Sequence, residues 1–329
     1  MKRRVLGSLI GGVVAALPSL PDAQPRSMPV IGWLGSGSSA LTSSSTNNRD
    51  AFRLGLREAG YFEGRNVAFE NRLAENRYDR LPGLANELVD RKVQLIVAIG
   101  DPAAHAAKAA TTTIPVVFVV GDDPVAAGLI ASLARPAGNL TGVTVLTGEL
   151  GPKRIELLRE LLPGIGTIAL LSNPANPASE RAIRDARSAA RILKVQLHEL
   201  SAATESEIDA AFVALASLGA GALLVEADQL LLARREQIVA LAAGSAIPTM
   251  FGFRAFAVAG GLISFGQDLT VPFRQIGVYA GRILSGARPA DLPVAQPIAV
   301  ELVVNLETAK TLGLTIPPSL LVRADEVIE

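Results

Sequence analysis

The chain has 329 residues, of which 49% are hydrophobic and 4% aromatic, so it is long enough for two globular domains packed mainly with aliphatic side chains. Its 31 basic and 31 acidic residues cancel, which disfavours nucleic acid and anionic membrane surfaces as partners. Because the chain has no cysteine, disulfides, thiolate catalysis, cysteine-bound zinc and a lipid-attachment cysteine are excluded.

The N-terminus has the order of a secretory signal peptide. Three cations at residues 2–4 precede an apolar run over residues 5–17, and cleavage is expected near Ala23. The alternative is a frayed N-terminal helix. The run is too short for a membrane anchor, and no later stretch approaches the roughly 20 apolar residues of a membrane span. We therefore expect residues 1–23 to be removed, leaving a periplasmic chain that is neither inserted in the membrane nor lipid-anchored.

Strands and helices alternate through the first part of the chain. Short apolar or alternating runs predict the strands, and amphipathic segments between them predict the helices. In order, they are a strand at Val30–Leu34, a helix ending at Gly60, a strand at Val67–Asn71, a helix at Tyr78–Lys92, a strand at Leu95–Ile99, a helix at Ala103–Ala110, a strand at Val116–Val120, a short helix ending at Leu133 and an extended stretch at Leu140–Leu146. This alternation predicts a parallel sheet with helices on both faces.

The alternation restarts after Gly151 and predicts a second sheet. Its elements are a helix at Pro152–Leu162, a strand at Thr167–Leu171, a helix at Ala178–Leu193, a strand at Val195–Leu200, a helix at Glu205–Leu218, a strand at Ala222–Val225, a helix at Leu230–Ala243, and strands at Ile247–Met250 and Leu262–Phe265. A helix at Val271–Ser285, a Pro-rich stretch and a strand at Ile298–Val304 follow. We expect these last segments to cross back. The first lobe would then comprise residues 30–143 plus 267–296, and the second lobe residues 144–266 plus 297–329.

The turn at residues 100–104 joins a buried strand to a helix and is the first candidate binding element. Pro102 suits a first helical turn, where its missing N–H costs nothing. The free N–H groups of such a turn attract a carboxylate or phosphate, and parallel sheets bind ligands at these strand ends. Asp101 leaves a second interpretation open, since its side chain is also suited to capping the helix.

Two further turns carry polar groups at strand ends. Asp122 and Asp123 follow the strand at Val116–Val120, where Asp123 is placed to pair with an ammonium group or to cap a helix. Asn173 and Asn176 follow a strand of the second sheet, and their amides suit either ligand contact or turn formation.

Catalytic and metal-binding residues are few. Neither His105 nor His198 has a carboxylate at a spacing typical of a triad or a metal site, so we expect no catalytic residue, metal or cofactor. One enzyme pattern remains, since residues 35–40 match the G-x-G-x-x-G/A pattern of dinucleotide-binding proteins, with Glu70 as a possible ribose partner. An NAD-dependent oxidoreductase using this loop is therefore the alternative function, although residues 42–48 delay the helix that the pattern requires.

Several motifs resemble the substrate-binding proteins of ABC transporters, in the branch that includes tryptophan and tyrosine binders. The resemblance covers nearly all of the mature chain, and its most specific part is the tail. It rests on residues 114–125, Gly128-Leu129, residues 132–142, 260–266 and 287–293, and the tail at 301–306 and 312–321. It implies the type I periplasmic binding protein fold, with two Rossmann-like lobes joined by three crossovers.

The resemblance also implies which residues bind the ligand. They are Ser36 and Gly37 in the first loop, Gly100, Asp101, Ala103 and Ala104 in the first turn, Asp123, then Asn173, Asn176 and Glu226 from the second lobe, and Phe251 and Phe253 in the loop ending at Arg254. For an amino-acid ligand, the helix N-terminus would bind the carboxylate and Asp123 the ammonium group. Phe251, Phe253 or Phe265 would face an apolar side chain.

The chain departs from similar sequences at three positions, where Asp101 replaces a common Thr or Ser, Asp122 a frequent Gly, and Phe265 a frequent Tyr. The resemblance implies a monomeric periplasmic protein that captures a small molecule, an amino acid with an aromatic or branched side chain or a related compound, between its lobes. Its partner would be an ABC permease, or a receptor kinase if the protein acts in sensing.

Overall fold

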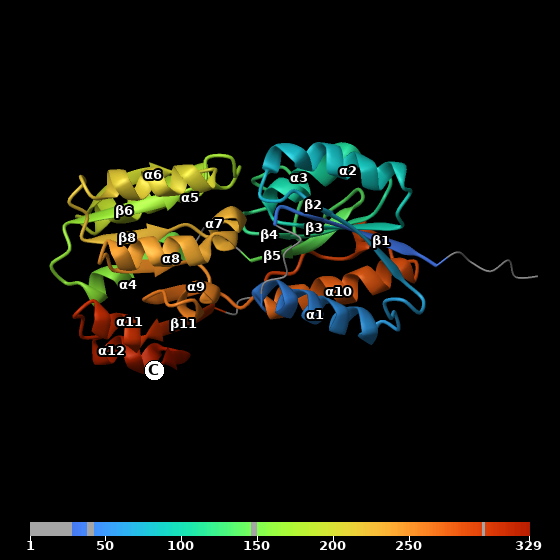
Figure 1. The fold of residues 1–329 in the computed structure, drawn as a ribbon. Helices are drawn as coiled ribbons and strands as arrows, with labels where there is room; N and C mark the ends of the chain where they lie inside the picture. The colour runs from blue at the N-terminus through green and yellow to red at the C-terminus, as the bar shows by residue number, and fades with distance from the viewer. Residues whose placement is uncertain (1–27, 38–42, 146–149, 298–299) are drawn as a thin grey trace, which may run out of the picture.

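The computed structural model describes residues 28–37, 43–145, 150–297 and 300–329, which form two α/β lobes (Figure 1). The predicted signal peptide lies outside these residues. Of the helices in the described ranges, none has the length and apolar character needed to cross a membrane.

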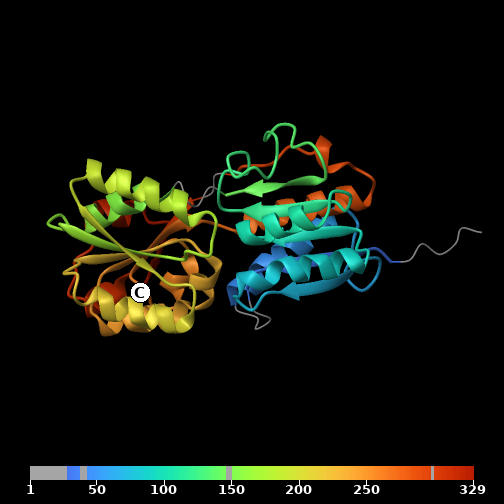
Figure 2. The same cartoon turned by 90° about the horizontal axis from the view of Figure 1, so that it is seen from above.

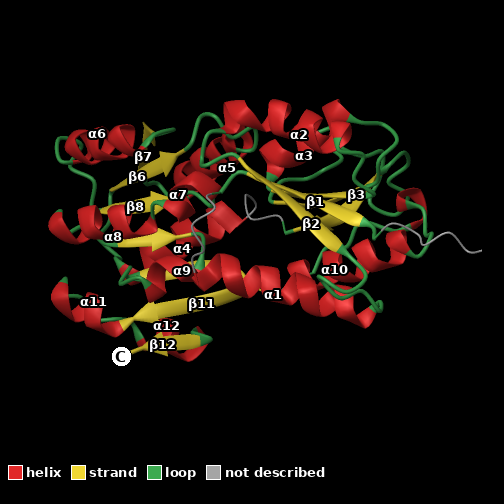
Figure 3. Ribbon diagram, turned by 45° about the vertical axis from the view of Figure 1, so that its right-hand side comes forward, coloured by secondary structure: helices red, strands yellow, loops and turns green. Residues whose placement is uncertain are grey.

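The first lobe is a parallel sheet covered by helices on both faces. Its elements are β1 (Val30–Gly35), α1 (Ser43–Glu58), β2 (Ala68–Leu73), η1 (Tyr78–Arg80), α2 (Leu81–Asp90), β3 (Leu95–Ile99), α3 (Asp101–Ala110), β4 (Val116–Val120), β5 (Leu140–Thr144), α10 (Thr270–Leu284) and η3 (Pro289–Asp291). The strand order is β2-β1-β3-β4-β5. Helices α2 and α3 pack on one face, and α1 and α10 on the other, as Figure 3 shows. This double cover explains why β3 and β4 are apolar along their whole length.

Helices α1 and α10 touch because glycines lie where they cross. A Cβ added to Gly55 would lie 1.9 Å from the carbonyl oxygen of Arg274, and one added to Gly277 would lie 2.1 Å from that of Phe52. Only glycine permits so close an approach of two helix backbones. The late segment α10 is thereby fixed to the first lobe.

The second lobe is built around a larger sheet. Its elements are α4 (Gly151–Leu161), β6 (Thr167–Ser172), α5 (Ser179–Ile192), β7 (Gln196–Ser201), α6 (Glu205–Leu215), β8 (Ala222–Val225), α7 (Gln229–Ala233), α8 (Arg235–Gly244), β9 (Thr249–Phe251), α9 (Arg254–Val258), β10 (Ile263–Gln267), β11 (Val300–Asn305), α11 (Leu306–Thr311), α12 (Pro318–Arg323) and β12 (Glu326–Ile328). The strand order is β12-β11-β10-β9-β8-β6-β7, and β11 runs antiparallel to β10. Alternate residues of β6 pack against α4 and α5 on one face and against α6 and α8 on the other.

The chain passes between the lobes after β5, after β10 and before β11, so the last segments do cross back (Figure 2). Ala295 forms a bridge with Val143 at the edge of the first sheet before the chain returns to the second.

Four expectations about elements were wrong or incomplete. Residues 43–48, which were expected to delay the helix after the first loop, belong to α1. The short helix ending at Leu133 is a series of turns over residues 124–128, because Gly128 takes a φ of 70° and prolines flank the segment. The predicted helix at Leu230–Ala243 is split into α7 and α8 at Arg234. The pattern did not predict α9, α11, α12 and β12, since each has six residues or fewer and packs against the finished sheet or neighbouring helices.

Candidate functional site

A cleft between the lobes brings together the carboxyl ends of strands from both sheets. Two adjoining cavities, partly open to solvent, share the lining residues Asp101, Gly121, Asn176 and Ala227. The first two follow β3 and β4, and the other two follow β6 and β8. Open α/β sheets bind ligands at such strand ends, so this cleft is the candidate site.

The first-lobe wall is organised by the turn between β3 and α3. Gly100 takes a φ of 90°, which glycine adopts readily, and directs the start of α3 toward the cleft. The buried carboxylate of Asp101 accepts hydrogen bonds from the N–H groups of Gly121 (3.0 Å) and Asp122 (3.2 Å). Burial raises the pKa of this carboxyl to about 6, although the two N–H groups act to lower it. Asp101 thus joins the turns behind β3 and β4.

The other first-lobe residues implied by the resemblance lie at different depths. The Oγ of Ser36 is buried, has no hydrogen-bond partner among the described residues, and lies 3.9 Å from the position of a Cβ on Gly100. Ala103 and Ala104 are buried in the core, and the N–H of Ala104 donates to the carbonyl of Gly100 (3.0 Å). Gly37 is not among the described residues that line either cavity. Ser36 also lines neither cavity, but its unpartnered hydroxyl lies behind Gly100, which lines the second cavity.

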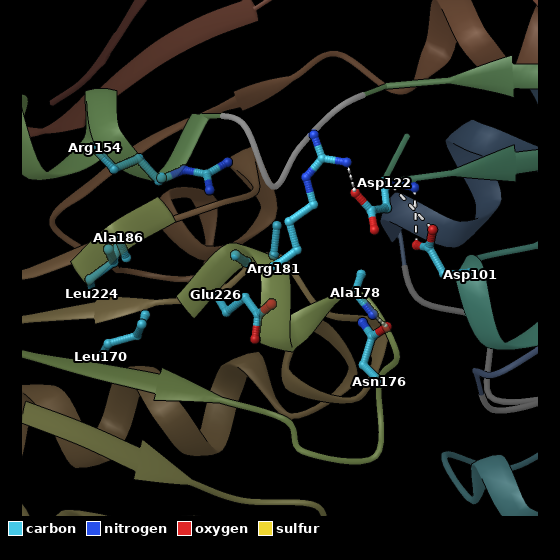
Figure 4. A pocket seen from close by; sticks show the side chains of 14 residues that line it. Asp101, Asp122, Arg154, Leu170, Asn176, Ala178, Arg181, Ala186, Leu224 and Glu226 are labelled. Atoms are coloured by element: carbon cyan, nitrogen blue, oxygen red, sulfur yellow. Dashed lines mark hydrogen bonds and ion pairs between the residues drawn. The ribbon is translucent and has the colours of Figure 1, made fainter. Parts of the chain in front are cut away.

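The two carboxylates behind β4 face different partners. Asp123 accepts hydrogen bonds from the N–H groups of Val125 (2.8 Å) and Ala126 (3.2 Å), so it caps its own turn. Asp122 lines the first cavity, and its Oδ1 lies 3.3 Å from Nη1 of Arg181 on helix α5 (Figure 4). Arg181 is also 3.9 Å from Oδ2 of Asp123. The cation beside the expected ammonium site is thus a side chain of the second lobe.

The second-lobe wall holds two buried groups of opposite charge, Arg154 of α4 and Glu226 behind β8. Nε of Arg154 donates to the carbonyl of Phe265 (2.7 Å), and the hydroxyl of Ser179 donates to Glu226 (2.7 Å). Burial raises the pKa of Glu226 to about 7 and lowers that of Arg154 to about 10. Their mutual attraction opposes both shifts.

Arg154 was not among the site residues predicted from the sequence, although its helix carries a signal. Arg154 lies on the buried stripe of α4 together with Ile155, Leu158 and Leu161. A cation on a core-facing stripe needs compensation for its desolvation, and Glu226 supplies part of it. Such a residue is a candidate for a functional site.

Beyond this charged wall, the first cavity ends between apolar side chains. Leu170 of β6 and Leu224 of β8 lie on its sheet side, and Ala182 and Ala186 of α5 lie opposite. Figure 4 shows Leu170, Leu224 and Ala186 at the end of the cavity away from Asp101. The cavity therefore combines charged groups with an apolar end.

The amides of Asn173 and Asn176 are engaged with the protein itself. Their Nδ2 atoms donate to the two carboxylate oxygens of Asp228, at 3.1 and 2.9 Å. Their Oδ1 atoms accept hydrogen bonds from the N–H groups of Ala175 (3.0 Å) and Ala178 (3.1 Å). Only Asn176 lines the cavities, while Asn173 is fully buried. Their main contribution in this structure is to shape the loop.

The three phenylalanines have separate surroundings. Phe253 lines the second cavity. Phe251 is fully buried and stacks on Phe256 with ring centroids 4.5 Å apart, so it belongs to the core. The ring of Phe265 packs against a core cluster of the second lobe. Of these side chains, Phe253 is the one placed on the cleft.

The histidines lie apart from one another. His105 is on the first turns of α3, where partial burial lowers its pKa, and His198 is in strand β7 at the far edge of the second sheet. No group of three His, Cys, Asp or Glu side chains suited to a metal ion occurs in the described ranges.

The chain is similar to known proteins over most of its length. The family model described as ABC transporter substrate binding protein matches residues 42–328. A curated relative, the tyrosine-binding protein of Clostridioides difficile (strain R20291), is 27% identical over 266 residues, which is 81% of this chain and 76% of the relative.

Two similar solved structures differ in their state. The ABC domain in complex with L-Trp from Streptococcus pneumonia has 27% identity and a TM-score of 0.83, covering 92% of this chain and 100% of that chain. A ligand-free, open substrate binding protein from Clostridium difficile has 25% identity and a TM-score of 0.62, covering 91% and 99%. Since identity and coverage are nearly equal, the lobes of this chain are arranged more like those of the L-Trp complex.

These matches confirm the expected type I periplasmic binding protein fold. The family is one of transport proteins, so it offers no support for the oxidoreductase interpretation of residues 35–40. Part of that loop, residues 38–40, lies outside the described residues. The chain belongs to the family of ABC transporter substrate binding proteins.

Proposed function

We propose that the protein captures an amino acid with an aromatic or branched apolar side chain between its lobes and delivers it to an ABC permease. The observation that carries this proposal is the first cavity, which combines two cations, three carboxyl groups and an apolar end in one space. Relatives that bind tyrosine or contain L-Trp support the same class of ligand.

The charges of the cavity favour a ligand without net charge. Arg154 and Arg181 bring two positive charges, while Asp101, Asp122 and Glu226 bring three carboxyl groups. The pKa values of Asp101 and Glu226 are raised to about 6 and about 7, so Glu226 is partly protonated near neutral pH. Positive and negative charge therefore nearly balance, which suits a zwitterion better than an anion or a polyamine.

We place the ligand carboxylate at the N-terminus of α3, where Ser36 offers an unpartnered hydroxyl and the helix dipole favours an anion. The ammonium group would face Asp122 and Glu226 rather than Asp123. Phe253 and the apolar end of the first cavity would then surround the side chain.

The proposal includes the cellular setting. Residues 1–23 act as a signal peptide, and the mature monomer works in the periplasm without a lipid anchor. Its lobes, residues 30–143 plus 267–296 and residues 144–266 plus 297–329, move as units about the three passages between them. Closure buries the ligand between both walls.

A thermal-shift screen tests this function. The protein is melted with amino acids, small amides, organic acids and sugars, and a ligand at 100 times its Kd adds about 2.7 kcal/mol of stability. We expect apolar amino acids to raise the melting temperature. A response to sugars or organic acids alone would contradict the proposal.

A pair of variants then assigns the response to the cleft. Glu226→Gln removes a carboxylate from the cavity and is expected to weaken amino-acid binding about tenfold, as for a hydrogen bond to a charged group. Glu156→Gln changes an exposed carboxylate on α4 and is expected to leave binding unchanged. Equal effects of the two substitutions would place the ligand elsewhere.

A further inference from the structure

A tyrosine of the first lobe donates a hydrogen bond to the second lobe. Tyr78 begins η1, and its hydroxyl lies 2.9 Å from Oδ2 of Asp228, the residue that caps helix α7. The same hydroxyl accepts a hydrogen bond from the N–H of Leu230 (3.3 Å). The ring of Tyr78 packs against core clusters of both lobes. Tyr78 thus bridges the lobes next to the second cavity, which it lines.

Hydrogen bonds within the second lobe hold Asp228 in position for this contact. Its carboxylate is 1% exposed and accepts hydrogen bonds from the amides of Asn173 and Asn176 and from the N–H groups of Leu230 and Leu231. These four bonds lie within the second lobe and do not depend on Tyr78. The acceptor therefore keeps its position when the lobes separate.

The hydroxyl of Tyr78 remains a hydrogen-bond donor at physiological pH. Burial, and then the negative charge of Asp228, raise the pKa of Tyr78 well above its usual value, so the hydroxyl keeps its proton at physiological pH. Another charged contact across the cleft, Arg181 with Asp122, has side chains 31% and 18% exposed. Water competes more readily for that pair than for a hydrogen bond to a buried carboxylate.

We propose that Tyr78 is a positioning residue for ligand capture, whose hydrogen bond to Asp228 favours the closed arrangement of the lobes before a ligand arrives. This hydrogen bond forms only when the lobes are close, so it stabilises the closed state alone. Apparent affinity is reduced by the fraction of molecules that are not competent to bind, and the bond raises the competent fraction. It also places Asn176, which shares Oδ2 of Asp228 with Tyr78, at the cavity wall.

The chain offers a matched control for removing this hydroxyl. It has three tyrosines, and the hydroxyl of Tyr279 donates to the carbonyl of Pro293 (2.6 Å) within the first lobe. Tyr78→Phe and Tyr279→Phe therefore each delete one phenolic hydrogen bond. Only the first of these bonds crosses the cleft.

The test measures the distance between the lobes in the ligand-free full chain. Because the chain has no cysteine, Ala109→Cys on α3 and Val213→Cys on α6 give two unique spin-label sites, both exposed. Pulsed electron resonance then compares this labelled background with the two Phe variants. We expect Tyr78→Phe to raise the open-to-closed ratio about tenfold and Tyr279→Phe to leave it unchanged. Identical distance distributions in the background and Tyr78→Phe would overturn the proposal.

An affinity measurement extends the test and rests on the proposed function. Calorimetric titration with L-tyrosine and L-tryptophan is expected to give up to about tenfold weaker binding in Tyr78→Phe, and no change in Tyr279→Phe. If neither amino acid binds the parent protein, the proposed ligand class fails while the distance measurement still decides the role of Tyr78. If affinity falls without any change in distances, Tyr78 acts as a ligand contact and the proposal is rejected.

Discussion

The two walls of the cleft are built from different kinds of groups. On the first lobe, backbone N–H groups and small residues dominate, with Gly100 at the start of α3 and Asp101 holding the N–H groups of Gly121 and Asp122. On the second lobe, the wall includes the buried charged side chains of Arg154 and Glu226 beside an apolar end. The first wall depends on chain conformation, and the second on contacts between distant side chains.

This difference has consequences for stability. A substitution that removes a hydrogen-bond partner on the first wall leaves backbone N–H groups that are near solvent at the cleft. Losing one on the second wall leaves buried polar groups without partners, and each of these costs about 1–3 kcal/mol. Substitutions should therefore have larger effects on the second wall.

Asp228→Ala is expected to show the largest effect. It removes the acceptor for Asn173, Asn176 and two backbone N–H groups in a buried place, so we expect a loss of about 4 kcal/mol in the free energy of unfolding. Denaturant unfolding measures it. Asp79→Ala, which removes an exposed partner of Arg77, should cost less than about 0.5 kcal/mol. Similar losses for both would mean that the buried network adds no stability.

Glu226→Gln is expected to change how stability depends on pH. The pKa of Glu226 is about 7 in the folded protein, above the ordinary value of 4.5. The folded state therefore binds more protons between these values, and stability falls as pH rises through the window. We expect this substitution to reduce the loss between pH 5 and pH 8 by about 2 kcal/mol. Glu156→Gln should retain the full loss, and a parallel curve for Glu226→Gln would contradict the pKa shift.

Arg181→Gln tests the ion pair that joins the two walls. Partly exposed pairs contribute about 0.2–1 kcal/mol, so ligand affinity should fall two- to fivefold, and less at high salt. Calorimetry at two salt concentrations measures this. Arg187→Gln lies on the same helix but pairs with Glu199 within the second lobe, so it should not change affinity. A loss independent of salt would point to a direct ligand contact instead.

Asp123→Asn is expected to have the smallest effect. Asp123 caps the turn at Val125 and Ala126, and asparagine caps such turns nearly as well. Affinity should stay within about twofold of the parent value, since Asp122 rather than Asp123 lines the cavity. A loss of tenfold or more would restore the assignment of Asp123 to the ligand ammonium group.

The first wall could be predicted from the sequence better than the second wall, because the sequence signals for the first wall are local. Pro102 and the apolar run before Gly100 predicted the strand, the turn and the start of α3. The partners of Asp101 lie 20 and 21 residues away, so no local pattern distinguishes a helix cap from the observed bonds to Gly121 and Asp122.

On the second wall, residue type alone was a poor guide. Asn173 and Asn176 are suited to bind a ligand, yet their amides bind Asp228, which lies 55 and 52 residues further along the chain. Arg154 resembles a surface cation until the buried stripe of α4 is considered. These pairings form only after both sheets are assembled, so the sequence indicates the loop without its contacts.

Recognition of a zwitterionic amino acid in the cleft is tested most directly by calorimetric titration of the protein with L-tyrosine and two analogues. Tyramine lacks the carboxylate, and 3-(4-hydroxyphenyl)propionate lacks the ammonium group. A cavity with balanced charges and an apolar end should bind the amino acid and bind each analogue at least tenfold more weakly, since each leaves one charged wall without its partner. L-tryptophan, measured beside it, covers a larger side chain. Equal affinity for the amino acid and both analogues, or no binding of either amino acid, would contradict the account.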